Sequence, residues 1–342
     1  MIILNNEKID SRSGPAKSIN LLRSKVLKNR KYIYCFFGDN KLYFDLIIND
    51  KKKRENIFSV YKLFFFSKKI FINGIFSFSF SVIPLIASFF LKKKIIISPR
   101  GQIAPETLIK KKYVKLLYFY FLYLVQKYSK SKIFWLVTSV REKNFLEYFI
   151  NYSKLDISII DNLNDLGFKK IKPIIKKKNS LKLFYFSNLT KKKNILETIS
   201  IIKNCNNKKI QLDIYGKVID HKYFKKVLHE IKNTPNINYK SYINKNSDLE
   251  KVFSKYHLLI HNSLGENYGH ILVEAMSHGI PFVSNDTHPW VDIDSDMDGF
   301  VSPVNLIHQQ SEMINFLYKI DNKIYQKYRK KFYNFYKQKI YS

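Results

Sequence analysis

The chain has 342 residues, which is long enough for two domains with separate cores. Lysine and arginine outnumber aspartate and glutamate by 60 to 27, for a formal net charge of +33. The bias toward Lys, Ile, Asn, Phe and Tyr is typical of AT-rich coding, so the charge by itself does not establish nucleic-acid binding. A solvated basic surface and attraction to an anionic membrane face both remain open.

The first half of the chain alternates short apolar segments with longer helical patterns. The strands expected from β-branched and aromatic runs are 32–37, 70–72, 94–98, 134–138 and 157–160. The helices expected between them are 16–27, 79–90, 109–127 and 140–149. This alternation predicts an α/β domain with a parallel sheet.

A second alternating set follows a break in the pattern at residues 162–180, which contain glycine, proline and several lysines. The expected strands are 181–187, 210–215, 237–240, 257–261 and 281–284. The expected helices are 194–203, 222–233, 248–254 and 271–278, with 310–341 helical in pieces. Two successive α/β domains are therefore predicted, with ligands at the carboxyl ends of the strands.

Targeting and membrane signals are weak. The N-terminus lacks the basic lead and the long apolar run of a signal peptide. Residues 74–91 are long enough to span a bilayer but contain four serines and Pro84, so we expect a buried helix. Residues 113–125 are too short to span and could lie on a membrane surface. Cys35 and Cys205 have no zinc-ligand spacing and are expected to be reduced, as suits a cytoplasmic protein.

Two carboxylates, Glu266 and Glu274, are separated by seven residues within the segment 261–284. The segment is expected to form a strand, a loop and a helix, with Gly269 where the helix begins. Free N–H groups at a helix start bind phosphate, and carboxylates accept hydrogen bonds from sugar hydroxyls. A ligand with its diphosphate at this helix start would meet a carboxylate on each side, which predicts a nucleoside diphosphate sugar.

The same segment resembles the donor-site signature of family 4 glycosyltransferases, retaining enzymes of the GT-B fold. The matching residues are Gly-Glu-Asn-Tyr-Gly-His at 265–270, Glu-Ala-Met at 274–276 and Gly-Ile-Pro at 279–281. The resemblance implies that Glu266 is catalytic, holding the sugar hydroxyls, and that Glu274 binds the ribose diol. It places the remaining residues of the helix start, Tyr268, Gly269, His270 and Ile271, against the donor; the alternative for His270 is a neutral cap.

The start of the second domain also resembles this family, with one departure. Relatives carry an arginine after the first strand and a lysine five residues later, and both neutralise the donor diphosphate. Lys193 matches the lysine, whereas Asn188 stands at the arginine position and brings no charge. Either Lys191 or Lys192 compensates, or the donor site is weakened.

Three segments of the first half match the family less specifically. Gly14 lies in a segment that resembles the N-terminal glycine loop near the donor phosphate, or forms a plain turn. Arg100 lies in a Ser-Pro-Arg-Gly turn shared with a subgroup that assembles bacterial surface polysaccharide, and is expected to be catalytic; the alternative is pairing with a carboxylate such as Glu106. Asn73 and Gly74 resemble the acceptor-pocket segment, or satisfy a turn.

GT-B membership implies two Rossmann-like domains facing a central cleft. The expected organisation begins with an N-terminal acceptor domain (1–165) and a linker (166–180). A C-terminal nucleotide-sugar domain (181–315) follows, and a last helix (316–342) crosses back to the first domain.

The implied activity is retaining transfer of a hexose-type sugar from a nucleoside diphosphate sugar to a lipid-linked saccharide in surface polysaccharide (lipopolysaccharide) biosynthesis. No metal and no cofactor beyond the nucleotide sugar are expected, and the protein is placed in the cytoplasm or peripherally on the inner face of the cytoplasmic membrane. The alternatives are an epimerase or phosphorylase on the same fold, a basic nucleic-acid-binding protein, and a degenerate transferase. No nucleic-acid motif is present, so no nucleic-acid partner is expected.

Overall fold

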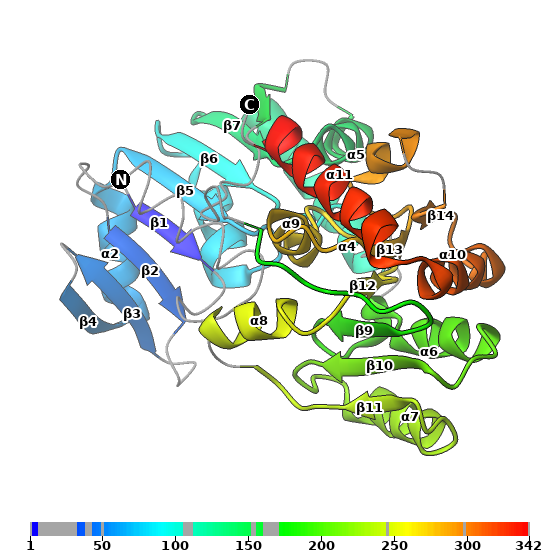
Figure 1. Ribbon diagram of the computed structural model, residues 1–342. Helices are drawn as coiled ribbons and strands as arrows, with labels where there is room; N and C mark the ends of the chain where they lie inside the picture. The colour runs from blue at the N-terminus through cyan, green and yellow to red at the C-terminus, as the bar shows by residue number, and fades with distance from the viewer. Residues whose placement is uncertain are drawn as a thin grey trace. The chain divides into compact units, whose positions relative to one another are not determined.

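The computed structural model describes nine parts of the chain, which are residues 2–5, 33–37, 43–48, 51–104, 112–151, 155–159, 171–243, 246–296 and 299–340. The chain divides into two compact units, Met1–Asp165 and Leu166–Ser342. Each unit has its own sheet and its own hydrophobic core (Figure 1).

The first unit is built on an eight-stranded sheet in the order β4-β3-β2-β1-β5-β6-β7-β8. The strands are β1 (Ile2–Asn5), β2 (Ile33–Phe37), β3 (Tyr43–Ile48), β4 (Lys51–Asn56), β5 (Lys69–Asn73), β6 (Lys94–Ser98), β7 (Lys132–Val137) and β8 (Ile157–Ile159). All neighbours from β2 to β8 pair in parallel, and β3 and β4 add an antiparallel edge. The parallel sheet is confirmed, and the antiparallel edge was not expected.

The helices of the first unit follow the expected pattern with two changes, an additional helix over 57–66 and a division of the helix expected over 79–90. They are α2 (Ile57–Phe66), a π-helical turn η2 (Phe78–Val82), α3 (Ile83–Ala87), α4 (Lys112–Tyr128) and α5 (Val140–Ile150). The single helix expected over 79–90 is therefore two short pieces; Ser77 caps the first, and the second begins at Ile83 with Pro84 in its first turn. The expected helix 16–27 lies outside the described residues. No helix in the described ranges is long and apolar enough to cross a membrane.

The second unit is a six-stranded, wholly parallel sheet in the order β11-β10-β9-β12-β13-β14. The strands are β9 (Leu181–Phe186), β10 (Ile210–Tyr215), β11 (Ile237–Tyr239), β12 (Leu258–His261), β13 (Phe282–Asn285) and β14 (Val301–Ser302). Numbered from its own first strand, this order is 3-2-1-4-5-6, which is the Rossmann order. The direction of winding reverses between β9 and β12, and ligands bind at that reversal in such sheets.

The helices of the second unit are η4 (Lys191–Lys193), α6 (Ile195–Asn204), α7 (His221–Lys232), α8 (Asn246–Phe253), α9 (His270–Ser277), η5 (Val291–Asp296), α10 (Ile307–Lys319) and α11 (Asn322–Ile340). They pack their apolar faces against the sheet, and the core combines helix residues such as Ile199 and Leu272 with strand residues such as Leu183, Leu212 and Ile260. These strands are continuous apolar runs because both faces of a parallel sheet are covered.

The last helix, α11, packs against α9 within the second unit. Buried Arg329 donates from Nε to the carbonyl of Gly279 (2.9 Å) and from a terminal nitrogen to that of Lys172 (2.9 Å). The ring of Phe332 lies edge-on to Phe282 at 5.1 Å. These contacts fix the C-terminal end of α9, the helix that begins after Gly269. The expected return of residues 316–342 to the first domain remains a prediction.

Candidate active site

Two loops meet at the winding reversal of the second sheet, one after β9 and one after β12. The amide of Leu264 donates to the carbonyl of Lys192 (2.8 Å), which ties the second loop to the turn η4 of the first. The carbonyl of Ser263 accepts from Asn285 Nδ2 (3.0 Å) and from Thr287 Oγ1 (2.5 Å). The loop after β12 is therefore fastened on both sides before it reaches Glu266.

Glu266 lies at the centre of a small cluster of charged and polar groups. Its Oε1 forms an ion pair with Lys193 Nζ and lies 2.9 Å from His261 Nε2. The Tyr185 hydroxyl donates to the carbonyl of Lys193 (2.9 Å), and the Tyr185 ring stacks on His261 at 6.3 Å. Residues from β9, η4 and β12 thus converge on one carboxylate.

The cluster keeps Glu266 ionised. Burial opposes the charged form, but the Lys193 ammonium and the hydrogen bond from His261 outweigh it and hold the pKa of the carboxyl well below its usual range. The neighbouring His288 is neutral because burial and the nearby His261 lower its pKa to about 3. Its Nδ1 accepts from the Trp290 amide (3.1 Å), so Nε2 donates to Ser284 Oγ (2.7 Å).

The start of α9 has the geometry of an anion site. Gly269 is in the left-handed region at φ 70°, and a Cβ there would lie 3.0 Å from Leu272 Cδ1. The amides of Leu272 (2.9 Å) and Val273 (3.2 Å) donate to the carbonyl of Gly269. The amides of Gly269, His270 and Ile271 belong to the helix start, where N–H groups point away from the helix and favour an anion.

An aromatic group supports this helix start. Trp290 Nε1 donates to the carbonyl of Tyr268, and the two rings lie edge to face at 5.2 Å. Tyr268 also contacts the ring of His270 at 4.8 Å. Glu274, one turn further along α9, is buried at 6% exposure. The predicted donor residues of the loop and helix are therefore adjacent.

Asn188, by contrast, is exposed after β9, and no described residue hydrogen-bonds its side chain. Lys191 and Lys192 are also exposed and belong to the same turn as Lys193. The only cation paired with Glu266 among the described residues is Lys193.

The first unit brings together Arg100, predicted to be catalytic, and the predicted acceptor residues Asn73 and Gly74. Arg100 Nε donates to Asn73 Oδ1 (2.8 Å), which joins the ends of β5 and β6. Gly74, at φ 90°, donates its amide to the carbonyl of Ser98 (2.8 Å). Burial lowers the pKa of Arg100 to about 10, opposed by the charge of Glu142. Gly14 and Glu106 lie outside the described residues.

Neither Glu142 nor His261 was predicted from the sequence as a site residue. Buried Glu142 accepts the amide of Gly101 on one oxygen and the amide (2.8 Å) and hydroxyl (2.9 Å) of Thr138 on the other. It thus fixes the turn that carries Arg100. The only sequence signal for it is an acid three residues after the helix cap Ser139.

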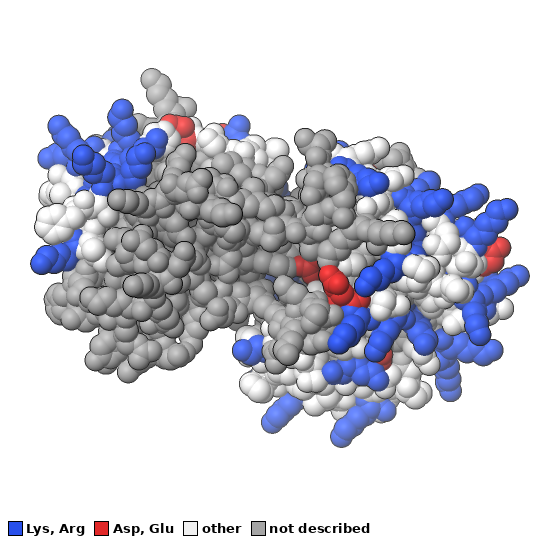
Figure 2. Space-filling view, turned by 60° about the vertical axis from the view of Figure 1, so that its left-hand side comes forward, with Lys and Arg blue, Asp and Glu red and all other residues white. Residues whose placement is uncertain are grey.

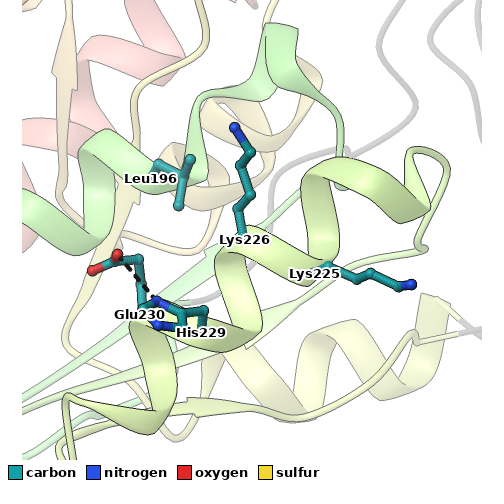
Figure 3. Close-up of a pocket in the computed structure, with 5 residues that line it drawn as sticks. All are labelled: Leu196, Lys225, Lys226, His229 and Glu230. Atoms are coloured by element: carbon teal, nitrogen blue, oxygen red, sulfur yellow. Dashed lines mark ion pairs between the residues drawn. The ribbon is translucent and has the colours of Figure 1, made fainter.

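A shallow pocket of about 380 Å³ lies elsewhere in the second unit, lined by Leu196, Lys225, Lys226, His229 and Glu230 of α6 and α7 (Figure 3). It contains none of the predicted site residues. Within the described ranges, no group of three or more His, Cys, Asp or Glu side chains is placed to hold a metal ion.

The chain is similar to one protein family and to several solved structures. The family described as glycosyl transferases group 1 matches residues 168–338, half of the chain. The structure of Anabaena Alr3699/HepE in complex with UDP-glucose is 14% identical at a TM-score of 0.75, covering 99% of this chain and 94% of that one. WaaG, a glycosyltransferase involved in lipopolysaccharide biosynthesis, is 10% identical at a TM-score of 0.67, covering 100% and 96%.

S. aureus TarM is 16% identical at a TM-score of 0.61, covering 90% of this chain and 60% of that one. A comparison with curated proteins gives no match. The fold and the site define a GT-B protein with two Rossmann-like units. The chain belongs to the glycosyl transferases group 1 family and is a glycosyltransferase.

Proposed function

We propose that this glycosyltransferase moves a hexose-type sugar from a nucleoside diphosphate sugar to a saccharide hydroxyl, with retention at the anomeric carbon, in surface polysaccharide biosynthesis. The observation that carries the proposal is the placement of Lys193, Glu266 and the start of α9 at the winding reversal of the second sheet. Uridine is the favoured base because structures of similar fold are described as complexes with UDP.

Each group has a role that its position supports. Lys193 and the amides of Gly269 to Ile271 stabilise the negative charge that builds on the departing diphosphate. Glu266 holds the sugar hydroxyls and orients the anomeric carbon, and Glu274 binds the ribose diol. Because a cation and helix amides neutralise the leaving group, no divalent metal is required. Arg100 is a further catalytic residue, and Asn73 and Gly74 bind the acceptor.

Thermal shift and calorimetry with UDP, GDP, ADP and CDP test the donor site in wild type and in Glu274→Ala. Stabilisation by UDP that the substitution removes supports the proposal. Stabilisation by another diphosphate names a different base. Stabilisation by none, together with no sugar transfer from UDP-hexoses, contradicts the proposal and favours a degenerate transferase disabled at Asn188.

A lipid-linked acceptor at the membrane face is the second part of the proposal. The outer stripe of α4 exposes Tyr113 (84%), Leu117 (69%) and Tyr120 (59%) at helical spacing, while Phe119 and Leu122 of the same helix are buried. Lysines such as Lys112 and Lys127 are exposed on that helix. Figure 2 shows lysine and arginine side chains scattered over the described surface, with few acidic ones. Such a surface suits an anionic bilayer.

Co-sedimentation with anionic vesicles at low and high salt tests this part. We expect binding at low salt that weakens with salt and that is reduced by Tyr113→Ser with Leu117→Ser. Tyr148→Ser, at an equally exposed aromatic position of α5 (77%), is the matched control. Absence of binding at low salt contradicts the membrane proposal.

A further inference from the structure

His261 is the last residue of β12 and is buried among apolar strand residues, with 1% of its surface exposed. Its Nε2 faces Glu266 Oε1 at 2.9 Å. A carboxylate can only accept, so Nε2 carries the hydrogen and donates it to Oε1. Nδ1 is buried and has no hydrogen-bond partner in the described part of the chain.

This arrangement is unfavourable for folding alone. A buried polar atom without a partner destabilises the folded state, and an apolar ring of similar volume would avoid this cost. Glu266 does not need His261 to compensate for lost contact with water. The Glu266 side chain is 13% exposed, and its carboxylate already pairs with Lys193. The imidazole is therefore better explained by what it does to the carboxylate than by packing.

The two protein donors meet on the same oxygen. Lys193 Nζ and His261 Nε2 both contact Oε1 of Glu266, whereas Oε2 has no partner among the described residues. Oε1 is therefore held by the protein, whereas Oε2 is left to accept a hydrogen bond from a ligand. Of the two anchors, Lys193 is the mobile one, because its side chain is 23% exposed and four carbons long, whereas His261 is held by stacking on Tyr185.

We propose that His261 is the positioning residue that holds Glu266 in place when Lys193 turns from the carboxylate to the donor diphosphate. The inference rests on the proposed function, in which Lys193 and Glu266 act on different parts of one donor. In the resting protein Lys193 neutralises Glu266. When an anion binds at the start of α9, Lys193 is shared with it, and His261 remains as the donor that fixes Oε1 while Oε2 receives a sugar hydroxyl.

Two substitutions separate this role from simple packing. His261→Phe keeps the ring and its stacking on Tyr185 but removes the donor, and His261→Gln restores an N–H close to the position of Nε2. We expect His261→Phe to lower kcat about 10²-fold, the loss typical of a misplaced reacting group. His261→Gln recovers most of this loss. UDP affinity stays unchanged in both, because Lys193 and the helix amides bind the diphosphate.

The melting temperature and the pH dependence of kcat/KM distinguish this role from a purely structural one. Because the orphaned Nδ1 is removed, the melting temperature of His261→Phe equals or exceeds that of wild type. The groups facing Glu266 are Lys193, Tyr185 and His288 besides His261. With one donor lost and these unchanged, the pKa of Glu266 rises, so the acid limb of kcat/KM moves to higher pH.

The control is His257→Phe, at a buried histidine just before the other end of the same strand. It is expected to lower the melting temperature and leave kcat unchanged. A His261→Phe enzyme with wild-type kcat and an unmoved acid limb overturns the inference while the proposed function stands, and so does one that loses UDP binding together with stability. A wild-type protein that neither binds UDP nor transfers sugar overturns both.

Discussion

Lys193 and Glu266 form an ion pair although they are 73 residues apart in the chain. The pair joins the turn after β9 to the loop after β12, the two segments that flank the winding reversal of the second sheet. It gives the protein one cation and one carboxylate, already in contact, at the place where a charged ligand binds in such a sheet. In the proposed function, a bound diphosphate would compete with Glu266 for this cation.

Removal of the Lys193 charge is expected to weaken donor binding. A charge-assisted hydrogen bond contributes about 1.5–3 kcal/mol, so Lys193→Ala should weaken UDP binding by roughly 10–150-fold. Titration calorimetry measures the effect. Lys191→Ala, at an exposed lysine of the same turn, is the matched control and should change UDP binding little. If Lys191→Ala is the more harmful, then Lys191 compensates for the missing arginine at Asn188.

Gly269→Ala should damage both stability and donor binding. The residue is at φ 70°, where an L side chain is strained, and the added Cβ would touch Leu272. We expect a loss of about 1–3 kcal/mol of unfolding free energy and a fall in UDP affinity, because the amides that follow are moved. Urea unfolding and calorimetry measure the two effects.

The matched control for this change is Gly279→Ala, also at positive φ (62°) but at the far end of α9. It should lose comparable stability and keep UDP affinity at a temperature where it is folded. Equal loss of UDP affinity in both variants would show that helix stability, rather than the helix start, determines binding.

Much of the second unit could be predicted because its strands are continuous apolar runs and its signature residues are close in sequence. Glu266, Gly269 and Glu274 lie within one strand-loop-helix segment, so their proximity follows from local structure. The edge strand β4 could not be predicted, since its sequence Lys-Lys-Lys-Arg-Glu-Asn has no apolar alternation. Charged edge strands of this kind block pairing with other sheets.

Contacts between segments that are far apart in the chain could not be predicted from the sequence. Glu142 and Gly101 are 41 residues apart, and nothing local indicates that the acid in the first turn of α5 accepts the amide of that turn. Likewise, His261 is recognisable as a strand residue, but its direction toward Glu266 depends on how the loop folds back after β12. Pairing across a fold is determined by packing, which a local pattern does not contain.

Glu142→Gln is expected to destabilise the first unit. Its carboxylate accepts hydrogen bonds from three donors, which are Gly101 N, Thr138 N and Thr138 Oγ1. The glutamine side chain has an NH₂ group in place of one carboxylate oxygen, so at least one of these donors faces another donor. The loss of that hydrogen bond costs about 1–3 kcal/mol. Urea unfolding measures the loss. Glu147→Gln, at an exposed acid of the same helix that pairs only loosely with Lys143 (3.7 Å), should have almost no effect.

Because the Glu142 contact holds the turn of Arg100, Glu142→Gln should also lower the transfer rate under conditions where the variant is folded, without weakening UDP binding. A variant that is destabilised but transfers sugar at the wild-type rate would contradict a role for this turn in catalysis.

The folded protein is expected to lose stability at mildly acidic pH because the second unit contains two buried histidines. Burial lowers the pKa of His257 to about 4 and that of His288 to about 3. Both are neutral in the folded protein, while an unfolded histidine titrates near pH 6.5. The unfolded state therefore binds more protons below that pH, and stability falls as pH is lowered from about 6.5 toward 4, by up to about 1.4 kcal/mol per pH unit for each histidine.

His257→Asn isolates one of these contributions. An asparagine oxygen can replace Nδ1 as acceptor of the Lys182 amide (3.0 Å in the wild type) but does not titrate. Urea unfolding at pH 7, 6 and 5 should give a shallower pH dependence for the variant than for wild type, with the difference growing as pH falls. Identical slopes would mean that His257 is protonated in the folded state or that its surroundings rearrange to accept the charge.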